Sequence, residues 1–327
     1  MPSNNAKPPL HRAAFNAMGS RCEVQLYGPE ATAKAVAARA VERVRALEAK
    51  YSRYRSDSVT SRINAAAGTG KAVEVDAETA ALLDYAATLF EQSDGLFDIT
   101  SGVLRKAWDF KAEQLPSEEQ IAALVPLIGW AKVEWKSPFV RLPQAGMELD
   151  FGGYVKEYTA DCVADLCRAA GIENGMVNLG GDIHVIGPHP DGTPWQVGIQ
   201  HPREPDAAIA RIPLARGAIA TSGDYERYMV VNGTRYCHLL HPSTGRSLHP
   251  AFASVSVVAA RCLIAGSFTT IALLKSPEDP DWLSEQGLPY LTTDQELRLG
   301  GSLETGVSEA EHANSYSPPQ HSNGSPI

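Results

Sequence analysis

The sequence predicts an α+β fold, with mixed or antiparallel sheets flanked by helices. Segments that alternate between hydrophobic and polar residues, as strands do, outnumber segments with helical spacing. In the second half of the chain these strand-like segments often follow one another directly, which favours an α+β class. The 327 residues are 44% hydrophobic and 20% charged, a composition typical of a globular protein with a large core.

Turn and capping residues divide the chain into elements. Helices are expected to end at Gly95 and Gly171, because glycine commonly follows the last helical turn. The pair Asn232-Gly233 predicts a tight β-hairpin. The expected strands are 22–28, 73–76, 147–153, 175–187, 195–200, 217–223, 228–240 and 252–260, and the expected helices are 31–51, 77–95, 155–171 and 262–275.

One globular domain is expected at residues 13–300. Residues 1–12 and 301–327 are polar and rich in residues that disfavour a packed core, so both are expected to be disordered. No run reaches the roughly 18 apolar residues that a membrane-spanning helix needs. The N-terminus shows no signal-peptide core and no cysteine placed for lipid attachment. Together with five cysteines that lack metal-ligand spacing, this predicts a cytoplasmic protein with free thiols.

Polar segments marked by glycine interrupt the expected strands and form the candidate site. In LDFGGYVKEY, Asp150 precedes a Gly-Gly turn, and Lys156 lies in the first turn of the following helix. Such a corner lets backbone approach a phosphate closely, but a plain strand-turn-helix corner with a solvated lysine explains it too. NLGGDIHVIG, with Asn178 and Asp182, and ATSGDYERY are by themselves typical of tight turns.

The fourth segment, RYCHLLHPSTGRSLHP, places His238 near a glycine turn. A lone histidine in a strand is more often a structural residue than a base. In a cleft, however, His238 would be well matched to accept a proton from a serine or threonine hydroxyl.

Taken in order, eight segments resemble the FAD:protein FMN transferases, the ApbE-like family that is also called thiamine-biosynthesis lipoproteins. One such segment would be weak, but eight in the same order are specific. The resemblance implies an ApbE-like flavin transferase fold and an enzyme that binds FAD. The segments are AMGSRCEVQLYG (17–28), YSRYRSDSVTSRIN (51–64), GLFDITSGVLRKAWDF (95–110), LDFGGYVKEYTAD (149–161), VNLGGDI (177–183), TSGDYERY (221–228), HLLHPSTGRSL (238–248) and SVSVVAARCLIAGSFTTIALL (254–274).

The resemblance also implies roles for individual residues. Asp150 would hold ribose or adenosine hydroxyls, Lys156 would reach the pyrophosphate, and His238 would be the general base. Mg²⁺ would be bound by the backbone carbonyl of Gly153 and by an Asp and a Thr that share a helix face, of which Thr270 is present. The residues implied to line the FAD site are Met18, Tyr54, Leu96, Phe97, Asp98, Asp150 and Lys156.

The metal site is where this sequence departs from the family pattern. Gly266 stands four residues before Thr270, where the pattern has Asp, and Glu157 follows Lys156, where it has Gly. His241 replaces the Asp of the usual HIIDP. Because Mg²⁺ sites usually include one or two carboxylates, three interpretations are open. Glu157 supplies the missing carboxylate, the FAD phosphates and water hold the ion, or the chain binds flavin without transferring it.

The expected reaction is attack of a partner protein's Ser or Thr hydroxyl on the FMN-side phosphorus of FAD, with AMP as leaving group. With water as acceptor the same site would be an FAD pyrophosphatase that yields FMN and AMP, and a non-catalytic FAD-binding protein is the further alternative. A flavin redox enzyme lacks support because no GxGxxG motif opens a βαβ unit. The expected partners are FAD and an acceptor protein, and the net charge of −9 argues against nucleic acid.

Overall fold

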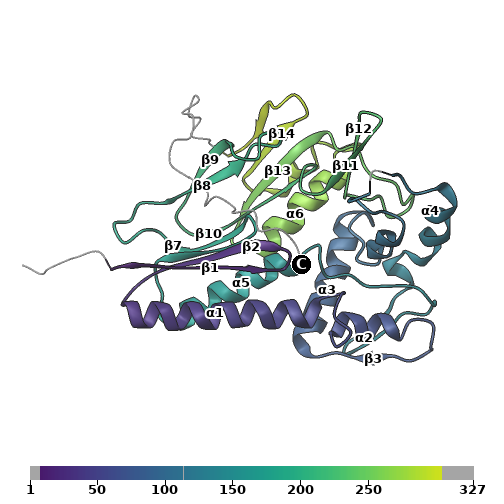
Figure 1. Cartoon of the computed structure of the whole chain (residues 1–327), viewed down its shortest axis with the longest axis horizontal. Coiled ribbons are helices and arrows are strands. Elements are labelled where there is room, and N and C mark those ends of the chain that lie inside the picture. The colour runs from purple at the N-terminus through teal and green to yellow at the C-terminus, as the bar shows by residue number, and fades with distance from the viewer. Residues whose placement is uncertain (1–7, 113, 304–327) are drawn as a thin grey trace, which may run out of the picture.

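The computed structural model describes residues 8–112 and 114–303, and an eight-stranded sheet lies at its centre (Figure 1). Every neighbouring pair in this sheet is antiparallel, which confirms the expected α+β class. The spatial order is β1-β2-β6-β7-β10-β13-β14-β15. These strands are β1 (Leu10–Ala17), β2 (Ser20–Tyr27), β6 (Gly175–Leu179), β7 (Asp182–Gly187), β10 (Gly217–Gly223), β13 (Phe252–Ala259), β14 (Tyr290–Asp294) and β15 (Leu299–Gly301).

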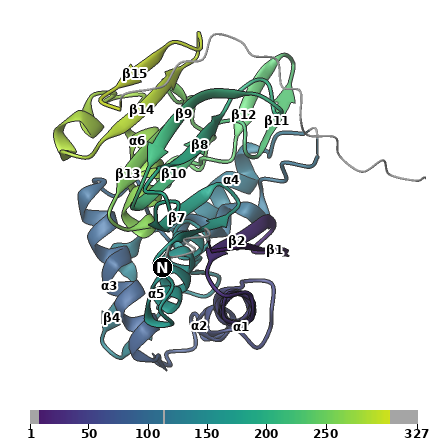
Figure 2. The ribbon, with the colours of Figure 1, turned by 90° about the vertical axis from the view of Figure 1, so that its left-hand side faces the viewer.

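Three long helices pack on one face of this sheet: α1 (Glu30–Tyr51), α5 (Val155–Ala169) and α6 (Cys262–Lys275). Figures 1 and 2 show α1 running beside β1 and β2, with α5 next to it. One face of α1 is hydrophobic and is buried against α5 and the strands β2 and β6. Burying each Val or Leu side chain contributes about 1.5–3 kcal/mol, so this layer holds α5 firmly under the sheet.

The opposite face of the sheet is covered by the hairpin of β8 (Trp195–Gln200) and β9 (Ala208–Leu214). Side chains of β8 alternate between buried and exposed, as the sequence pattern predicts. A second hairpin joins β11 (Tyr228–Val231) to β12 (Thr234–Cys237). Its turn residues Asn232 and Gly233 have φ values of 51° and 78°, which confirms the predicted tight turn.

The remaining elements form a lobe at one end of the sheet, on the right in Figure 1. Its longest helix, α3, ends before Gly95, as predicted, and its inner face belongs to the largest hydrophobic cluster. The lobe contains α2 (Val59–Ala65), α3 (Ala77–Gln92), α4 (Glu118–Leu124), β3 (Val73–Glu74), β4 (Glu134–Lys136), β5 (Phe139–Arg141) and the 3₁₀ turns η1 (Ser101–Lys106), η2 (Val125–Leu127) and η3 (Trp130–Lys132). The 3₁₀ turn η4 (Trp282–Gln286) packs against α6 instead.

Two expected boundaries differ in the structure. Residues 147–150 are not a strand, although Met147 and Leu149 are buried as the alternation predicts. The Asn64 side chain bonds both backbone groups of Leu149, and the Asp150 N–H bonds the Ile99 carbonyl, so no neighbouring strand pairs with them. Strand β1 begins at Leu10, inside the N-terminal segment expected to lack structure, and β15 ends at Gly301. The rest of the C-terminal tail, from residue 304, lies outside the described residues.

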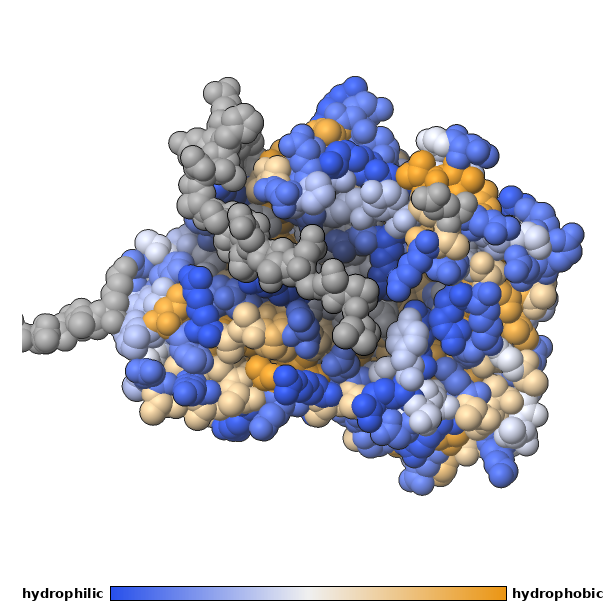
Figure 3. All heavy atoms as spheres, viewed as in Figure 1, coloured by the Kyte–Doolittle hydropathy of each residue, from blue (hydrophilic) through white to orange (hydrophobic). Residues whose placement is uncertain are grey.

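The surface offers no sign of a broad apolar face in the view of Figure 3, where hydrophobic residues form small patches among polar ones. Apart from Tyr228 and Val230, which share β11, the large exposed hydrophobic side chains of the described residues, Tyr54, Phe139 and Leu299, come from separate segments. Among the helices that the structure describes, none is long and apolar enough to cross a membrane.

Candidate functional site

Lys156 joins the first two polar segments. It lies in the first turn of α5, directly after the Gly152-Gly153 turn, and its Nζ is 2.8 Å from Oδ2 of Asp182. Asp182 opens β7 after the Gly180-Gly181 turn, and a Cβ added at Gly180 would lie 3.6 Å from the same Nζ. Lys156 therefore links the two segments, because it begins the helix after the Gly152-Gly153 turn and its ammonium lies beside the Gly180-Gly181 turn.

The charged groups in this site are buried and close enough to shift one another's pKa values. Burial disfavours the charge of Lys156, but the carboxylates of Asp182 and Glu157 outweigh that effect and raise the lysine pKa. Burial, followed by the nearby charge of Asp182, raises the pKa of Glu157. Burial also raises the pKa of Asp182. Two buried carboxylates thus share one lysine, which leaves the site short of positive charge.

The third and fourth segments meet the same lysine. Burial raises the pKa of Glu226, and the charge of Lys156 opposes that shift. The backbone N–H of His238 donates to the Arg227 carbonyl over 2.9 Å, which ties the two segments together. Burial, and then the charges of Arg227 and Lys156, lower the pKa of His238 to about 4. Its Nδ1 is buried and has no hydrogen-bond partner among the described residues. His238 is therefore neutral at pH 7, as a base must be.

Helix α6 brings Gly266 and Thr270 beneath α5 and β10. The Thr270 hydroxyl lies 3.3 Å from the Ser222 hydroxyl of β10, which also bonds Thr269 over 2.8 Å. A Cβ added at Gly266 would lie 2.5 Å from Cγ of Glu157 and 2.9 Å from its Oε1. The side chain of Glu157 consequently fills the space beside Gly266.

A second cluster forms around Asp150, three residues before Gly153. Arg53 pairs with the Asp150 carboxylate, which also accepts the Gly152 N–H over 2.9 Å. The Arg53 guanidinium lies 5.1 Å from the centre of the Tyr54 ring and donates to its hydroxyl over 3.0 Å. The Tyr54 side chain is 79% exposed, so this ring is open to a stacking ligand.

Met18 lies in the turn between β1 and β2, where its φ is 52° and its N–H donates to Glu48. A surface hollow of about 440 Å³ adjoins this turn and is lined by residues including Ala17, Gly19 and Glu48. Its volume is within the range of small-molecule sites. Gly19 also approaches Arg227, because a Cβ there would lie 3.9 Å from the Arg227 guanidinium. The turn that carries Met18 therefore borders the Lys156 site.

Leu96, Phe97 and Asp98 lie in the loop after α3. The Asp98 carboxylate is buried and accepts bonds from the backbone and hydroxyl of Thr100 and from the Trp130 N–H. The ring of Phe97 packs under the Gly-Gly turn, 3.3 Å from where a Cβ of Gly153 would be. Leu96 is partly buried against the main hydrophobic cluster. These contacts make the loop a support for Gly153, and its contact with FAD stays a prediction.

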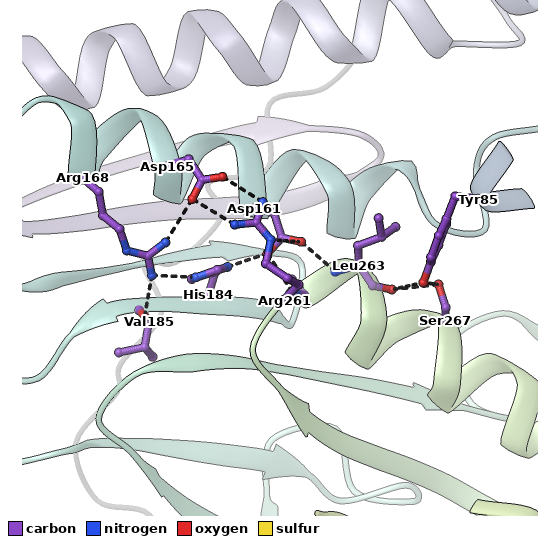
Figure 4. A network of polar contacts seen from close by, with 10 residues as sticks. Tyr85, Asp161, Asp165, Arg168, His184, Val185, Arg261, Leu263 and Ser267 are labelled. Atoms are coloured by element: carbon purple, nitrogen blue, oxygen red, sulfur yellow. Dashed lines mark hydrogen bonds and ion pairs between the residues drawn. The ribbon is translucent and has the colours of Figure 1, made fainter. Parts of the chain in front are cut away.

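An ionic network fixes α5, β7 and α6 relative to one another (Figure 4). Asp161 of α5 is 1% exposed, and its Oδ1 lies 2.5 Å from Nδ1 of His184 on β7. The same carboxylate accepts the N–H groups of Cys262 and Leu263, at 2.7 Å and 3.0 Å. Those are free N–H groups of the first turn of α6, where a negative charge is favourable. The network thereby sets Gly266 against Glu157.

No group of three or more His, Cys, Asp or Glu side chains in residues 8–112 and 114–303 is arranged to hold a metal ion. The predicted magnesium ligands are the backbone carbonyl of Gly153 and the hydroxyl of Thr270, which do not belong to these four side-chain types. His241, which stands where the family pattern has Asp, has its Nδ1 3.0 Å from the Ser243 hydroxyl in its own turn.

Sequence reasoning missed Arg53, Arg227 and the Asp161–His184 pair as parts of the site. The first two stand inside quoted motifs, YSRYRSD and TSGDYERY, and an arginine beside a candidate anion site is a usable signal. The pairing of Asp161 with His184 and with α6 joins three separate elements. No local pattern could have indicated it.

Comparisons with known proteins agree with this geometry. A model of the ApbE family matches residues 18–292. The FAD:protein FMN transferase of Klebsiella pneumoniae is 31% identical over 299 residues, which cover 86% of this chain and 92% of that protein. The corresponding protein of Vibrio cholerae is 31% identical over 235 residues, 70% of each chain.

Solved structures show the same relationship. The ApbE protein of Thermotoga maritima has a TM-score of 0.82 and 29% identity, and covers 90% of this chain and 97% of its own. The flavin transferase ApbE of Vibrio cholerae has a TM-score of 0.79 and 25% identity, over 90% of this chain and 98% of its own. The predicted fold and family are thus confirmed, and this chain belongs to the ApbE family.

Proposed function

We propose that this chain transfers FMN from FAD to a Ser or Thr hydroxyl of an acceptor protein and releases AMP. The observation that carries this proposal is the meeting of four separate polar segments around Lys156, with a neutral histidine beside it. The relatives named FAD:protein FMN transferase, which match most of the chain, support the same activity.

In the proposed reaction the acceptor hydroxyl oxygen bonds to the FMN-side phosphorus, and the bond from that phosphorus to the bridging oxygen breaks. AMP leaves with the bridging oxygen, and the hydroxyl proton passes to His238. The lowered pKa of His238 keeps it unprotonated and ready to accept that proton at neutral pH. Lys156 would hold the pyrophosphate, where a positive charge stabilises the charge that develops on the leaving phosphate.

The second cluster suits the rest of FAD. The Asp150 carboxylate would accept bonds from ribose or adenosine hydroxyls, and Arg53 holds it in place. The exposed ring of Tyr54 would stack on a flavin or adenine ring. Met18 and the loop of Leu96, Phe97 and Asp98 would border the same ligand.

The residues present fit a magnesium ion. Oε2 of Glu157 is buried with no hydrogen-bond partner among the described residues, so the site contains a buried carboxyl oxygen that no described protein group satisfies. Gly153 and Thr270 would hold the ion, and oxygen ligands of this kind suit Mg²⁺. When bound, the ion would neutralise charge on the pyrophosphate.

We also propose a cytoplasmic location. All five cysteines are free thiols, and four of them are buried. Burial raises the pKa of Cys167 to about 12, so the Cys167 thiol is not activated for redox chemistry. Free thiols of this kind are typical of proteins in a reducing compartment.

The deciding experiment incubates the purified chain with FAD, with and without Mg²⁺, and measures AMP by chromatography. A parallel reaction contains an extract of the source cells, and covalent flavin is detected by fluorescence after denaturing electrophoresis. Magnesium-dependent AMP together with a fluorescent protein band is the expected result. AMP and free FMN without a band would indicate the pyrophosphatase, and bound FAD that stays intact would indicate a flavin carrier.

A further inference from the structure

Glu157 and Gly266 differ from the family pattern in opposite senses, and the structure places them against each other. One position has gained a carboxylate and the other has lost one. A Cβ at Gly266 would lie 2.5 Å, 3.0 Å and 2.9 Å from Cγ, Cδ and Oε1 of Glu157, closer than side-chain atoms pack. An aspartate carboxylate is attached directly to Cβ. In its observed conformation Glu157 therefore occupies the volume that an aspartate at position 266 would need, and its side chain would have to move to admit one.

The Glu157 carboxyl group shares the charge of Lys156 with Asp182. The residue is 8% exposed, and Oε2 has no hydrogen-bond partner in the described part of the chain. The nearest ammonium, that of Lys156, is 2.8 Å from Asp182. A buried carboxylate without a partner costs several kcal/mol, so residues of this kind are usually paired or coordinate a metal.

The surroundings favour a hard divalent cation over an organic one. Thr270 stands four residues after Gly266 on α6, with its hydroxyl 3.3 Å from that of Ser222, and the Gly152-Gly153 turn precedes Glu157 at the start of α5. Carboxylate, hydroxyl and carbonyl oxygens are the ligands that Mg²⁺ and Mn²⁺ prefer. The Glu157 carboxyl group lies directly against α6, because position 266 carries no side chain.

We propose that Glu157 is a direct ligand of the active-site Mg²⁺ and that the metal carboxylate has moved from α6 to α5 in this chain. This inference rests on the proposed function, because it assigns a residue to the metal of that reaction. It also predicts that restoring the family's aspartate at position 266 does not by itself restore metal binding. An aspartate introduced at position 266 alone would collide with Glu157 and add a second negative charge, so it would not strengthen metal binding.

The test exchanges the two side chains. Mn²⁺ binding is measured by electron paramagnetic resonance, with Mg²⁺ as competitor, in the wild type, Glu157→Gln, Glu157→Gly, Gly266→Asp and the double variant Glu157→Gly/Gly266→Asp. Glu157→Gln keeps the shape of the side chain and isolates the charge. Asp165→Asn, on the exposed face of the same helix, is the charge-matched control. Circular dichroism establishes that each variant is folded.

We expect Glu157→Gln and Glu157→Gly to weaken Mn²⁺ binding by on the order of tenfold or more. The double variant should recover most of the loss, Gly266→Asp alone should show no gain, and Asp165→Asn should match the wild type. If Glu157→Gln binds Mn²⁺ as tightly as the wild type, the assignment is wrong, even when AMP release depends on Mg²⁺. If the wild type neither binds Mn²⁺ nor releases AMP, the proposed function fails instead.

Discussion

Removing the Asp161 carboxylate should destabilise the protein by several kcal/mol, because three buried groups depend on it. In Asp161→Ala, His184 Nδ1 and the N–H groups of Cys262 and Leu263 lose their acceptor. Loss of a helix cap costs about 1 kcal/mol, and each buried donor left without a partner costs about 1–3 kcal/mol. Since the network relaxes partly, we expect a total loss of about 3–5 kcal/mol in the free energy of unfolding.

The assay is urea unfolding at pH 7, followed by circular dichroism, with two companion variants. Asp161→Asn keeps the oxygen that faces His184 and Cys262 and should lose about half as much as the alanine variant. Asp165→Asn removes a carboxylate whose side chain is 50% exposed and pairs with Arg261, so it should change stability by about 0–1 kcal/mol.

If Asp161→Ala lowers the free energy of unfolding by less than about 1 kcal/mol, the reasoning is refuted, because capping of α6 by the Asp161 carboxylate would then contribute little to stability. The alanine variant should also bind Mn²⁺ more weakly than Asp161→Asn. The physical reason is that Thr270 and Gly266 lie on the helix that Asp161 holds in place.

Two further predictions concern His238 and Tyr54. His238→Ala should abolish AMP release while FAD, measured by flavin fluorescence, remains bound; equal turnover would remove the base assignment. The pKa of His238 is lowered to about 4 in the folded protein, so as the pH falls the unfolded chain is protonated first at this residue. The contribution of His238 to the free energy of unfolding therefore decreases as the pH falls from about 6.5 to about 4. His238→Gln should lose less stability than the wild type across that window in urea titrations, and parallel curves would contradict the shift. Tyr54→Ala should weaken FAD binding by roughly tenfold, since stacking on an aromatic ring contributes about 1–3 kcal/mol, and should leave the free energy of unfolding within about 0.5 kcal/mol. Tyr228→Ala, another exposed tyrosine, is the control, and an equal effect of both on FAD affinity would exclude stacking at Tyr54.

Signals that act over a few residues were sufficient to predict most elements. The helix at 262–275 and the turn at Asn232-Gly233 agree with the structure, because helix composition and turn chemistry are local properties. The segment at 147–150 has the alternation of a strand but lacks a strand beside it. Its partners are the Asn64 side chain and the Ile99 carbonyl, which no pattern within the segment could indicate.

The order of the eight motif segments also determined the family, and with it the identity of Lys156 and His238 as candidate site residues. What the sequence did not contain is how close these residues lie. Ion pairs such as Lys156–Asp182 and Arg53–Asp150 connect segments that lie far apart in the sequence and that only the tertiary packing brings together.

The two positions at the proposed metal site show the division between sequence and structure most clearly. From the sequence, Glu157 and Gly266 are two unrelated departures from a pattern, and three interpretations of them stay open. Only the packing of α5 against α6, fixed by Asp161, brings the two positions into one volume. Steric exclusion acts over a few ångströms in space regardless of distance along the chain, so the tertiary structure alone could make these two substitutions a pair.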